Sequence, residues 1–192
     1  TEQMSLMDMF EEKENLKEKL REKEVYGYDD EYMGNISPVN YKITGEKEVI
    51  PPSERLKNNI EAIEVLKLLE KEHRHASKEE QYILSRYVGW GGLSDVFDEE
   101  KQGQWKDARE FLKENLSSSE YDAARESTLT AFYTPKVVID SIYQALSNMG
   151  FECGNILEPS MGTGRFLGNL PESMQGSKFY GVELDSISGR ML

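Results

Sequence analysis

The stretch that decides the fold lies near the end of the chain and contains two glycines within a short turn. It reads Glu158-Pro159-Ser160-Met161-Gly162-Thr163-Gly164-Arg165-Phe166-Leu167. A short apolar run over residues 155–158 leads into this turn, and a second run follows over residues 178–183. Both runs predict strands. A strand, a glycine turn, a helix and a second strand form the opening βαβ unit of a doubly wound parallel sheet.

The glycine turn and an acid downstream of it predict a ligand site. Gly162 and Gly164 lack side chains, so a ligand can approach the backbone closely, and Glu183 ends the second predicted strand 19 residues after Gly164. An acid at that place can accept hydrogen bonds from both hydroxyls of a ribose. Nicotinamide and flavin sites use a similar turn, but Leu167 replaces the third glycine of their pattern. A cofactor without phosphates fits better, and a tight turn with an ordinary strand-end acid is the alternative.

The chain upstream of the sheet is predicted to be helical. Residues 5–24 have the spacing of an amphipathic helix, and the glycines and proline of residues 26–52 predict an irregular connector. A long helix is predicted from Pro52 onwards. Its apolar face consists of Leu56, Ile60, Ile63, Leu66 and Leu69. Further helices are expected after the capping box of Ser77 and Glu80, over residues 105–115, and after the capping box of Ser117 and Glu120.

Downstream of these helices the pattern changes. Thr134 and Pro135 predict the N-cap and the first residue of another helix. The residues expected on its buried face are Val138, Ile142, Ala145 and Met149. We expect three regions: a helix plus irregular connector over residues 1–52, a helical domain over 53–131, and a partial α/β domain over 132–192. Two strands do not complete a domain of that kind, so we expect it to be truncated.

Three motifs resemble those of amino-methylating DNA methyltransferases. Residues 158–167 resemble the (D/E)-P-x-x-G-x-G-x-F-L pattern of motif I, residues 133–135 resemble motif X, and residues 181–185 resemble motif II. The order of the motifs, with motif X in front, resembles the gamma arrangement of adenine-N6 enzymes. From about Asn58 onwards the chain is also similar to the front of large methylase-helicase proteins of phages, plasmids and conjugative elements.

This resemblance implies a fold and a cofactor. The fold would be an α-helical N-terminal region followed by the truncated start of an α/β class I methyltransferase (Rossmann-like) domain, and the cofactor would be S-adenosyl-L-methionine. Glu183 would bind the ribose hydroxyls, Glu158 would lie near the amino group of the cofactor, and Thr134 would contact its methionine portion. The cofactor-binding residues that the resemblance implies are Tyr133, Thr134, Pro135, Glu158, Pro159, Gly162, Gly164, Phe166, Glu183 and Leu184.

The catalytic motif of the resembling family does not occur in this sequence. No Asn-Pro-Pro-aromatic stretch is found among the 192 residues, so we expect no catalytic residue here. We expect the activity to reside in a longer protein, an adenine-specific DNA methyltransferase joined to a superfamily 2 helicase. Two alternatives stay open. One is a methyltransferase that acts on a non-DNA substrate, and the other is a non-catalytic DNA or protein interaction module.

Charge limits what the chain binds by itself. The sequence has 36 acidic and 23 basic residues and a net charge of −13, whereas binding to phosphates needs clustered Lys and Arg. We therefore expect DNA to be contacted through the missing C-terminal part. No apolar run approaches the length of a transmembrane helix and no signal peptide is evident, so we expect no membrane partner and a cytoplasmic location. The oligomeric state is left open.

Four further side chains bear on the fold more than on the chemistry. Cys153 borders the first predicted strand, where a small buried thiol is expected. Trp90 lies in the glycine-rich turn at which the helix after Ser77 is expected to end. A side chain that plugs the core is favoured there over an indole exposed to DNA. His73 and His75 have no Cys or third ligand near them in sequence, so we expect no metal site.

Overall fold

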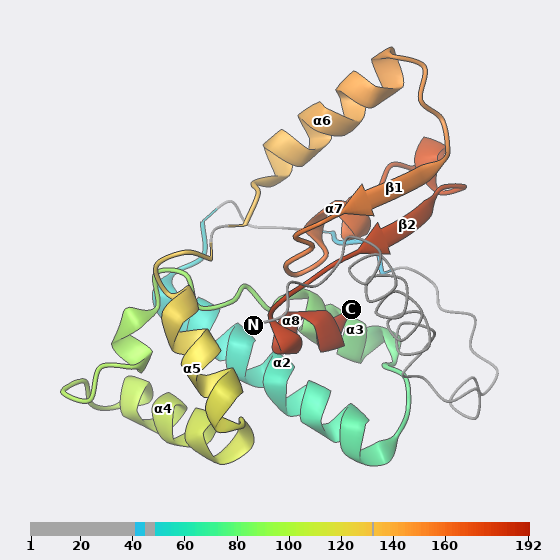
Figure 1. The fold of residues 1–192 in the computed structure, drawn as a ribbon. Helices are drawn as coiled ribbons and strands as arrows, with labels where there is room; N and C mark the ends of the chain where they lie inside the picture. The colour runs from blue at the N-terminus through green and yellow to red at the C-terminus, as the bar shows by residue number, and fades with distance from the viewer. Residues whose placement is uncertain (1–40, 45–48, 132) are drawn as a thin grey trace, which may run out of the picture. The chain divides into compact units, whose positions relative to one another are not determined.

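A computed structural model of the chain describes residues 41–44, 49–131 and 133–192. The chain divides into two compact units after Pro38, and all described residues belong to the second unit. The helix predicted over residues 5–24 and most of the connector predicted over 26–52 lie outside the described residues. The elements in chain order are α2 (Pro52–Glu72), α3 (Lys78–Ser85), η2 (Ser94–Val96), α4 (Gln104–Asn115), α5 (Ser118–Ser127), α6 (Lys136–Asn148), β1 (Asn155–Glu158), α7 (Arg165–Gly168), η3 (Glu172–Met174), β2 (Lys178–Gly181) and α8 (Ser186–Met191) (Figure 1).

Helices α2, α4 and α5 contribute to one apolar core. The predicted face of α2 lies in it or beside it, with Leu56, Ile63 and Leu66 buried and Ile60 partly buried. Trp90 is only 2% exposed, and its ring meets Phe97 edge-on with the two centroids 5.7 Å apart. The prediction that Trp90 plugs the core is therefore confirmed, and the indole is not available at the surface.

Both predicted capping boxes form. The Ser77 hydroxyl accepts a hydrogen bond from the Glu80 N–H at 3.3 Å, and the Glu80 carboxylate accepts one from the Ser77 N–H at 2.8 Å. Ser117 and Glu120 make the same pair of bonds at the start of α5. Helix α3 ends at Ser85, earlier than predicted. The backbone beyond it bonds to a side chain of α2 instead of continuing the helix.

Helix α8 joins the same core although it follows the sheet in sequence. Ile187 is buried in the cluster that the helical region forms. Arg190 forms ion pairs with Glu70 of α2 and with Glu120 of α5. Figure 1 shows α8 next to α2. Packing and ion pairing therefore connect the end of the βαβ unit to helices that lie 120 and 70 positions earlier in the chain.

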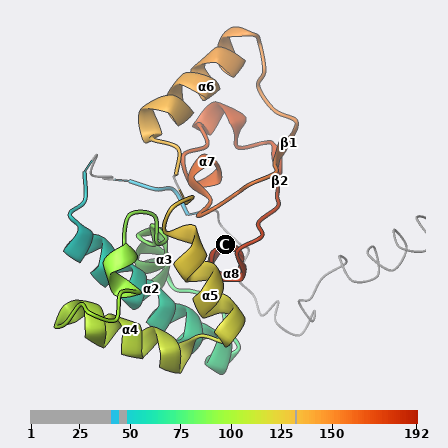
Figure 2. The same ribbon diagram turned by 60° about the vertical axis from the view of Figure 1, so that its left-hand side comes forward.

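The two strands form a parallel pair in the register Ile156 to Phe179 and Glu158 to Gly181. The second strand was predicted to run two residues further, to Glu183. Hydrogen bonding does continue past Gly181, because the Val182 N–H donates to the Glu158 carbonyl at 3.0 Å. The described part of the chain is thus mostly helical with a small two-stranded parallel sheet. Helices α6 and α7 lie on the same side of the strands (Figure 2).

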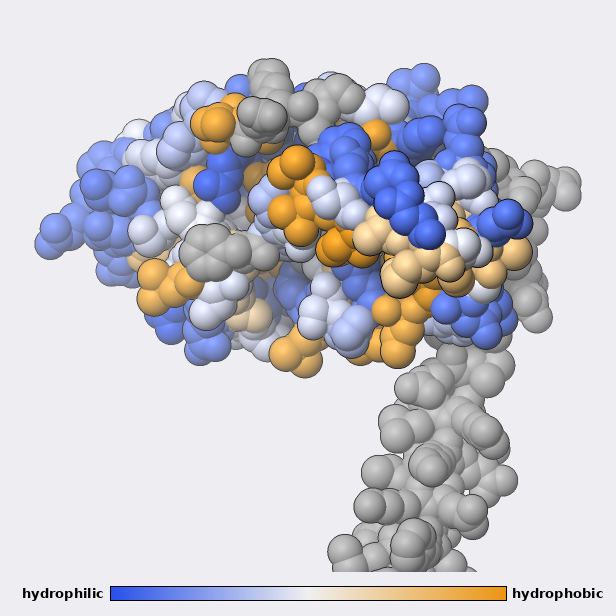
Figure 3. All heavy atoms as spheres, turned by 90° about the horizontal axis from the view of Figure 1, so that it is seen from above, coloured by the Kyte–Doolittle hydropathy of each residue, from blue (hydrophilic) through white to orange (hydrophobic). Residues whose placement is uncertain are grey.

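The predicted buried face of α6 is wrong. Ile139 and Tyr143 are the residues that α6 buries, in a second core cluster with Leu170 and Met174. Ile142, on the predicted face, is 42% exposed. The helix is apolar on two sides, so its period does not decide which side packs against the strands. The face seen from above, to which α6 contributes, accordingly shows hydrophobic atoms between hydrophilic ones (Figure 3).

Two local predictions are also wrong. Pro135, and not Thr134, is the N-cap of α6, and no side chain caps this helix. The Thr134 carbonyl instead accepts a hydrogen bond from Arg165 Nε at 3.0 Å, so Thr134 belongs to the connection that precedes the helix. Cys153 is exposed and not buried. It lies in the loop before β1, where the chain has not yet entered the sheet.

Candidate functional site

The glycine turn after β1 is folded by backbone conformations that side chains disfavour. Gly162 and Gly164 have φ angles of 55° and 68°, in the left-handed region that residues other than glycine rarely adopt. The Gly164 N–H donates to the Met161 carbonyl at 3.0 Å, and α7 begins directly afterwards. The Met161 N–H donates to the Val182 carbonyl at 2.9 Å. The turn is therefore tied to the end of β2.

Glu183 lies directly across from this turn. Its Oε2 accepts a hydrogen bond from the Gly162 N–H at 2.5 Å, and its Oε1 accepts one from the Asp185 N–H at 2.8 Å. Hydrogen bonds to an ionised acceptor are stronger than neutral ones. The two donors therefore fix the carboxylate where both strands end. The structure brings Gly162 and Glu183 together at one edge of the sheet.

Glu158 supplies a second carboxylate at the same edge of the sheet. Its side chain is half-buried, and Oε2 is buried without a hydrogen-bond partner among the described residues. Burial, followed by the charge of Glu183, raises the pKa of Glu158 to about 7. A buried acceptor without a partner costs free energy. The arrangement therefore favours a ligand that brings a hydrogen-bond donor or a positive charge to Glu158.

Tyr133 places its ring between two glycines. A Cβ atom added to Gly162 would lie 2.9 Å from Cε1 of the ring, and one added to Gly89 would lie 2.3 Å from its hydroxyl oxygen. Burial is the main cause that raises the pKa of Tyr133, and the hydroxyl of Ser188 acts in the opposite direction. The ring therefore connects the glycine turn of the sheet with the glycine loop of the helical region.

Other predicted site residues do not gather at the turn. Phe166 packs edge-on against Tyr143, with the ring centroids 6.0 Å apart, and its carbonyl accepts from the Tyr143 hydroxyl at 2.8 Å. Leu184 is 99% exposed. Pro159 and Pro135 are exposed beside the turn and at the start of α6. Phe166 therefore has a visible packing role, whereas Glu158, Gly162, Glu183 and the Tyr133 ring form the candidate site.

Several contacts at the site were not predicted. The Met161 side chain covers Gly181, since a Cβ there would lie 1.8 Å from Met161 Sδ. The Leu192 side chain covers Gly164, where a Cβ would lie 2.3 Å from Leu192 Cδ2. Asp185 caps α8 by accepting from the Ser188 N–H at 3.0 Å. Only this cap has a recognisable sequence signal, an acid three residues before its donor. The contacts across the glycines depend on the fold.

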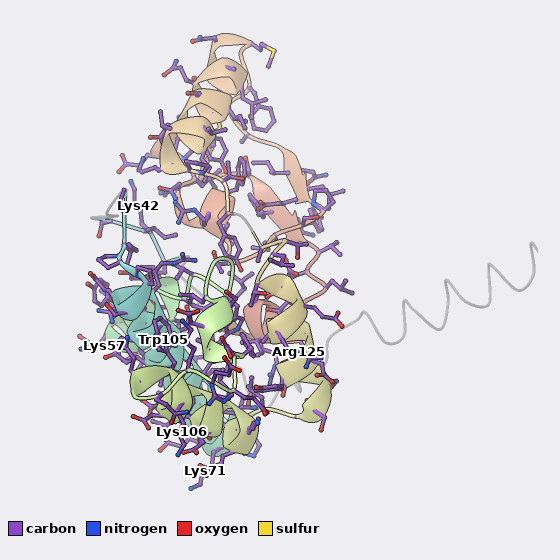
Figure 4. All side chains as sticks on the ribbon, turned by 90° about the vertical axis from the view of Figure 1, so that its left-hand side faces the viewer. Lys42, Lys57, Lys71, Trp105, Lys106 and Arg125 are labelled. Carbon is purple, nitrogen blue, oxygen red and sulfur yellow. The ribbon has the colours of Figure 1, made fainter. Side chains whose placement is uncertain are left out.

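A groove of about 700 Å³ lies elsewhere, between α2 and α4. Its lining residues are Ser53, Glu54, Leu56, Lys57, Ile60, Glu61, Gln104, Asp107, Ala108 and Phe111. Lys57 and Lys106 lie on this side of the molecule near Trp105 (Figure 4). Each of these lysines is near an acid of its own helix, Lys57 at 3.6 Å from Glu61 and Lys106 at 3.6 Å from Glu110. The side is therefore of mixed charge.

His73 ends α2 with a φ of 53°, and His75 follows in the connection to α3. No three His, Cys, Asp or Glu side chains among the described residues are placed to hold a metal ion. None of the helices in the described ranges combines the length and apolar composition that a membrane-spanning segment requires.

Partial matches to known proteins connect the chain with methyltransferases. Over 60 residues it is 38% identical to the type II methyltransferase M.CvrRI of Paramecium bursaria Chlorella virus XZ-6E, a region that covers 31% of the chain. Over 64 residues it is 34% identical to the defense against restriction protein B of Escherichia phage P1, which covers 33% of the chain. The matched regions span 15% and 3% of these relatives.

The matches support a relationship with methyltransferases. They do not extend to a shared family over the whole chain, because no family model matches it. No solved structure matches it either. The relationship at this level agrees with the motif resemblance.

Proposed function

We propose that the turn at Gly162 and the carboxylates of Glu158 and Glu183 bind S-adenosyl-L-methionine, in a protein that methylates adenine N6 in DNA. The observation that carries this proposal is the Glu183 carboxylate bonded to the Gly162 N–H where two parallel strands end. Open α/β sheets bind ligands at this edge. The partial identity to a type II methyltransferase supports the reaction class, and the relative named for defense against restriction supports DNA as the substrate.

The donors and charges of this cofactor fit the residues present. Glu183 has lone pairs left after its two backbone bonds, and these can accept from ribose hydroxyls. Glu158 has a buried oxygen without a partner, which an ammonium group would satisfy. Gly162 and Gly164 permit the left-handed turn that brings the Gly162 N–H to Glu183. When bound, the cofactor supplies an activated methyl group.

The reaction itself needs groups that this sequence does not contain. Adenine N6 is a weak nucleophile and is inaccessible in a stacked duplex, so the base has to be flipped out and held. In the proposed enzyme an Asn-Pro-Pro-aromatic motif elsewhere in the protein performs this role. The contribution of the described residues is to bind and orient the methyl donor. The gamma order of motifs and the joined helicase belong to the same proposal and rest on the motif resemblance.

The proposal is tested by replacing Glu183. In the full-length protein we expect Glu183→Ala to weaken the binding of S-adenosyl-L-methionine by about 1.5–3 kcal/mol for each hydrogen bond lost to the charged group. Isothermal titration calorimetry measures this affinity. Glu183→Gln is the second variant. It keeps one oxygen that accepts from a backbone N–H, and it loses the charge and the second acceptor, because an amide nitrogen donates.

Glu99→Ala is the matched control, since Glu99 is 83% exposed and contacts only Lys113 among the ion pairs of the described residues. Thermal unfolding of all variants separates a loss of binding from a loss of folding. Equal affinities of wild type and a folded Glu183→Ala variant would exclude the role assigned to Glu183.

A further inference from the structure

The glycine loop at residues 89–92 contacts the candidate site although it belongs to the helical region. A Cβ atom at Gly89 would lie 2.3 Å from the Tyr133 hydroxyl oxygen and 2.9 Å from Cε2 of its ring. On its other side the same ring lies against Gly162. Only a glycine leaves this much room for the ring at either position. Tyr133 is therefore held between one glycine of each region.

Side chains of α2 hold the loop through hydrogen bonds to the backbone of the loop. Asn59 is fully buried, its Nδ2 donates to the Gly89 carbonyl at 2.7 Å, and its Oδ1 accepts from the Val88 N–H at 2.9 Å. Arg55 donates from its guanidinium to the Gly91 carbonyl. Removing one partner of a buried hydrogen bond is costly, so the position of Gly89 is set by a side chain of α2.

The loop is also tied to the chain that leads to Tyr133. A Cβ atom at Gly91 would lie 1.9 Å from the Ala131 carbonyl oxygen. The Gly92 N–H donates to the Thr128 carbonyl at 2.9 Å. Both contacts are made with the segment that immediately precedes Tyr133. The loop therefore touches this residue directly, through its ring, and indirectly, through its backbone.

We propose that the Gly89–Gly92 loop is a positioning element of the site, which acts through the Tyr133 ring on the turn at Gly162. The Gly162 N–H is the donor that meets Glu183, so the place of this amide decides whether the two site groups are in register. Binding sites have to be held to within about 0.5 Å by their supporting residues. The consequence for cofactor affinity rests on the proposed function, whereas the consequence for the Gly162 turn does not.

The loop contains its own control. Gly89 and Gly92 have φ angles of 62° and 71°, so an alanine is strained to a similar extent at both positions. A Cβ at Gly92 would meet only Arg55 Nη1, at 3.6 Å. Gly89→Ala and Gly92→Ala therefore cause similar backbone strain, and only Gly89→Ala displaces the Tyr133 ring.

The experiment compares these two variants by hydrogen exchange and by calorimetry. Without cofactor, we expect Gly89→Ala to raise the exchange rate of the Gly162 amide at least about tenfold over Gly92→Ala, because its hydrogen bond to Glu183 is disturbed. With S-adenosyl-L-methionine, we expect an affinity at least about tenfold lower than that of Gly92→Ala. Equal exchange rates at Gly162 in the two variants would overturn the proposal.

A double variant shows whether the effect passes through Tyr133. In a Tyr133→Ala background, Gly89→Ala is expected to change the Gly162 exchange rate no further than Gly92→Ala does, because the ring that transmits the displacement is gone. Full additivity of the two substitutions contradicts the proposal. If Gly89→Ala alone fails to fold, the double variant is expected to fold again. A double variant that also fails to fold contradicts the proposal.

The two proposals fail separately. If the full-length wild-type protein does not bind S-adenosyl-L-methionine but the Gly162 exchange rates follow this pattern, the proposed function is wrong and the positioning role of the loop stands. If wild type binds the cofactor and both alanine variants bind it equally, the proposed function stands and the role of the loop is wrong.

Discussion

The surroundings of Glu158 disfavour the charged form of its carboxyl group. Its Oε2 is buried without a partner, and its pKa is raised to about 7, by burial first and then by the charge of Glu183. The charge of Glu158 in turn adds to the burial that raises the pKa of Tyr143 to about 12. The folded chain therefore holds a proton on Glu158 at pH values at which an unfolded chain has released it.

This difference makes stability depend on pH. Because the folded-state pKa of Glu158 is raised above its ordinary value of 4.5, its contribution is fully present below about pH 4.5 and is lost as pH rises through about 7. Glu158→Gln cannot ionise. We expect the free energy of unfolding of wild type to fall more between pH 5 and pH 8 than that of Glu158→Gln, as measured by urea denaturation.

The other titrating groups are common to both proteins, so the difference between the two pH profiles isolates Glu158. Parallel profiles would mean that its carboxyl is ionised in the folded chain at pH 5 as it is in the unfolded one. Glu172→Gln, at an exposed glutamate paired only with Lys42 among the described ion pairs, is the control and should follow wild type.

At this scale the sequence predicts that Gly162 and Glu183 lie at the same edge of the sheet, but not the protonation energetics of Glu158. The approach of Gly162 and Glu183 follows from motif spacing, because the ends of parallel strands share one edge of a sheet. The partnerless oxygen of Glu158 depends on which atoms surround it. No local pattern encodes that, and the same is true of the fit of Tyr133 between two glycines.

Among the elements, α6 gives the sharpest comparison. Ile139 is fully buried against the strands, whereas Ile142, one turn away, is 42% exposed. We expect Ile139→Ala to lower the free energy of unfolding by about 2–5 kcal/mol, since it leaves a cavity in the second core cluster. Ile142→Ala should change it by no more than about 0.5 kcal/mol.

Chemical denaturation measures the free energy of unfolding of both variants. The comparison is matched, because each variant replaces an isoleucine of α6 by alanine. A larger loss for Ile142→Ala would mean that α6 packs through the face that its apolar period first suggests. Helix α6 has two apolar sides. Such a result would mean that the side of Ile142 is the buried one and the side of Ile139 is the exposed one, and the helix itself would still form.

The capping boxes and the face of α6 show why some elements are predictable. Ser77 with Glu80 and Ser117 with Glu120 bond within four residues, so their geometry is contained in the local sequence. The orientation of α6 depends on Tyr143, which meets Phe166 from another element. A contact of that kind is visible only after the strands and the turn have formed.

Charge is the property that belongs to the whole molecule. The net charge is −13, and cations such as Lys57, Lys106 and Arg190 lie close to acids. We expect the 192-residue chain not to bind duplex DNA with micromolar or tighter affinity at physiological salt, because acids outnumber bases and binding to phosphates needs clustered Lys and Arg.

Titration of a fluorescently labelled duplex, followed by anisotropy, tests this expectation. A basic peptide of similar length serves as the positive control for the probe. Micromolar binding by the chain would mean that a DNA-contacting surface exists in it, and repeating the titration at several salt concentrations would then count the phosphates involved.

The packing of α8 against the helical core is not predicted from the sequence. The sequence indicates a helix after β2, but not that Ile187 packs into the core of α2, α4 and α5. Helix α8 is short and of mixed composition, so its sequence does not indicate which helices it packs against. Residues of the two regions expected over 53–131 and 132–192 therefore pack in one core. The boundary between these regions stays a prediction.

The same placement of α8 has a consequence during protein synthesis. Arg190 and its partner Glu70 are 120 positions apart, and a ribosome adds about 5–20 residues each second. The apolar face of α2 therefore leaves the ribosome about 6–24 s before the helix that completes its core. For that interval Ile63 and its neighbours lack part of their cover, and the nascent chain offers chaperones a binding surface that closes only when Ile187 arrives.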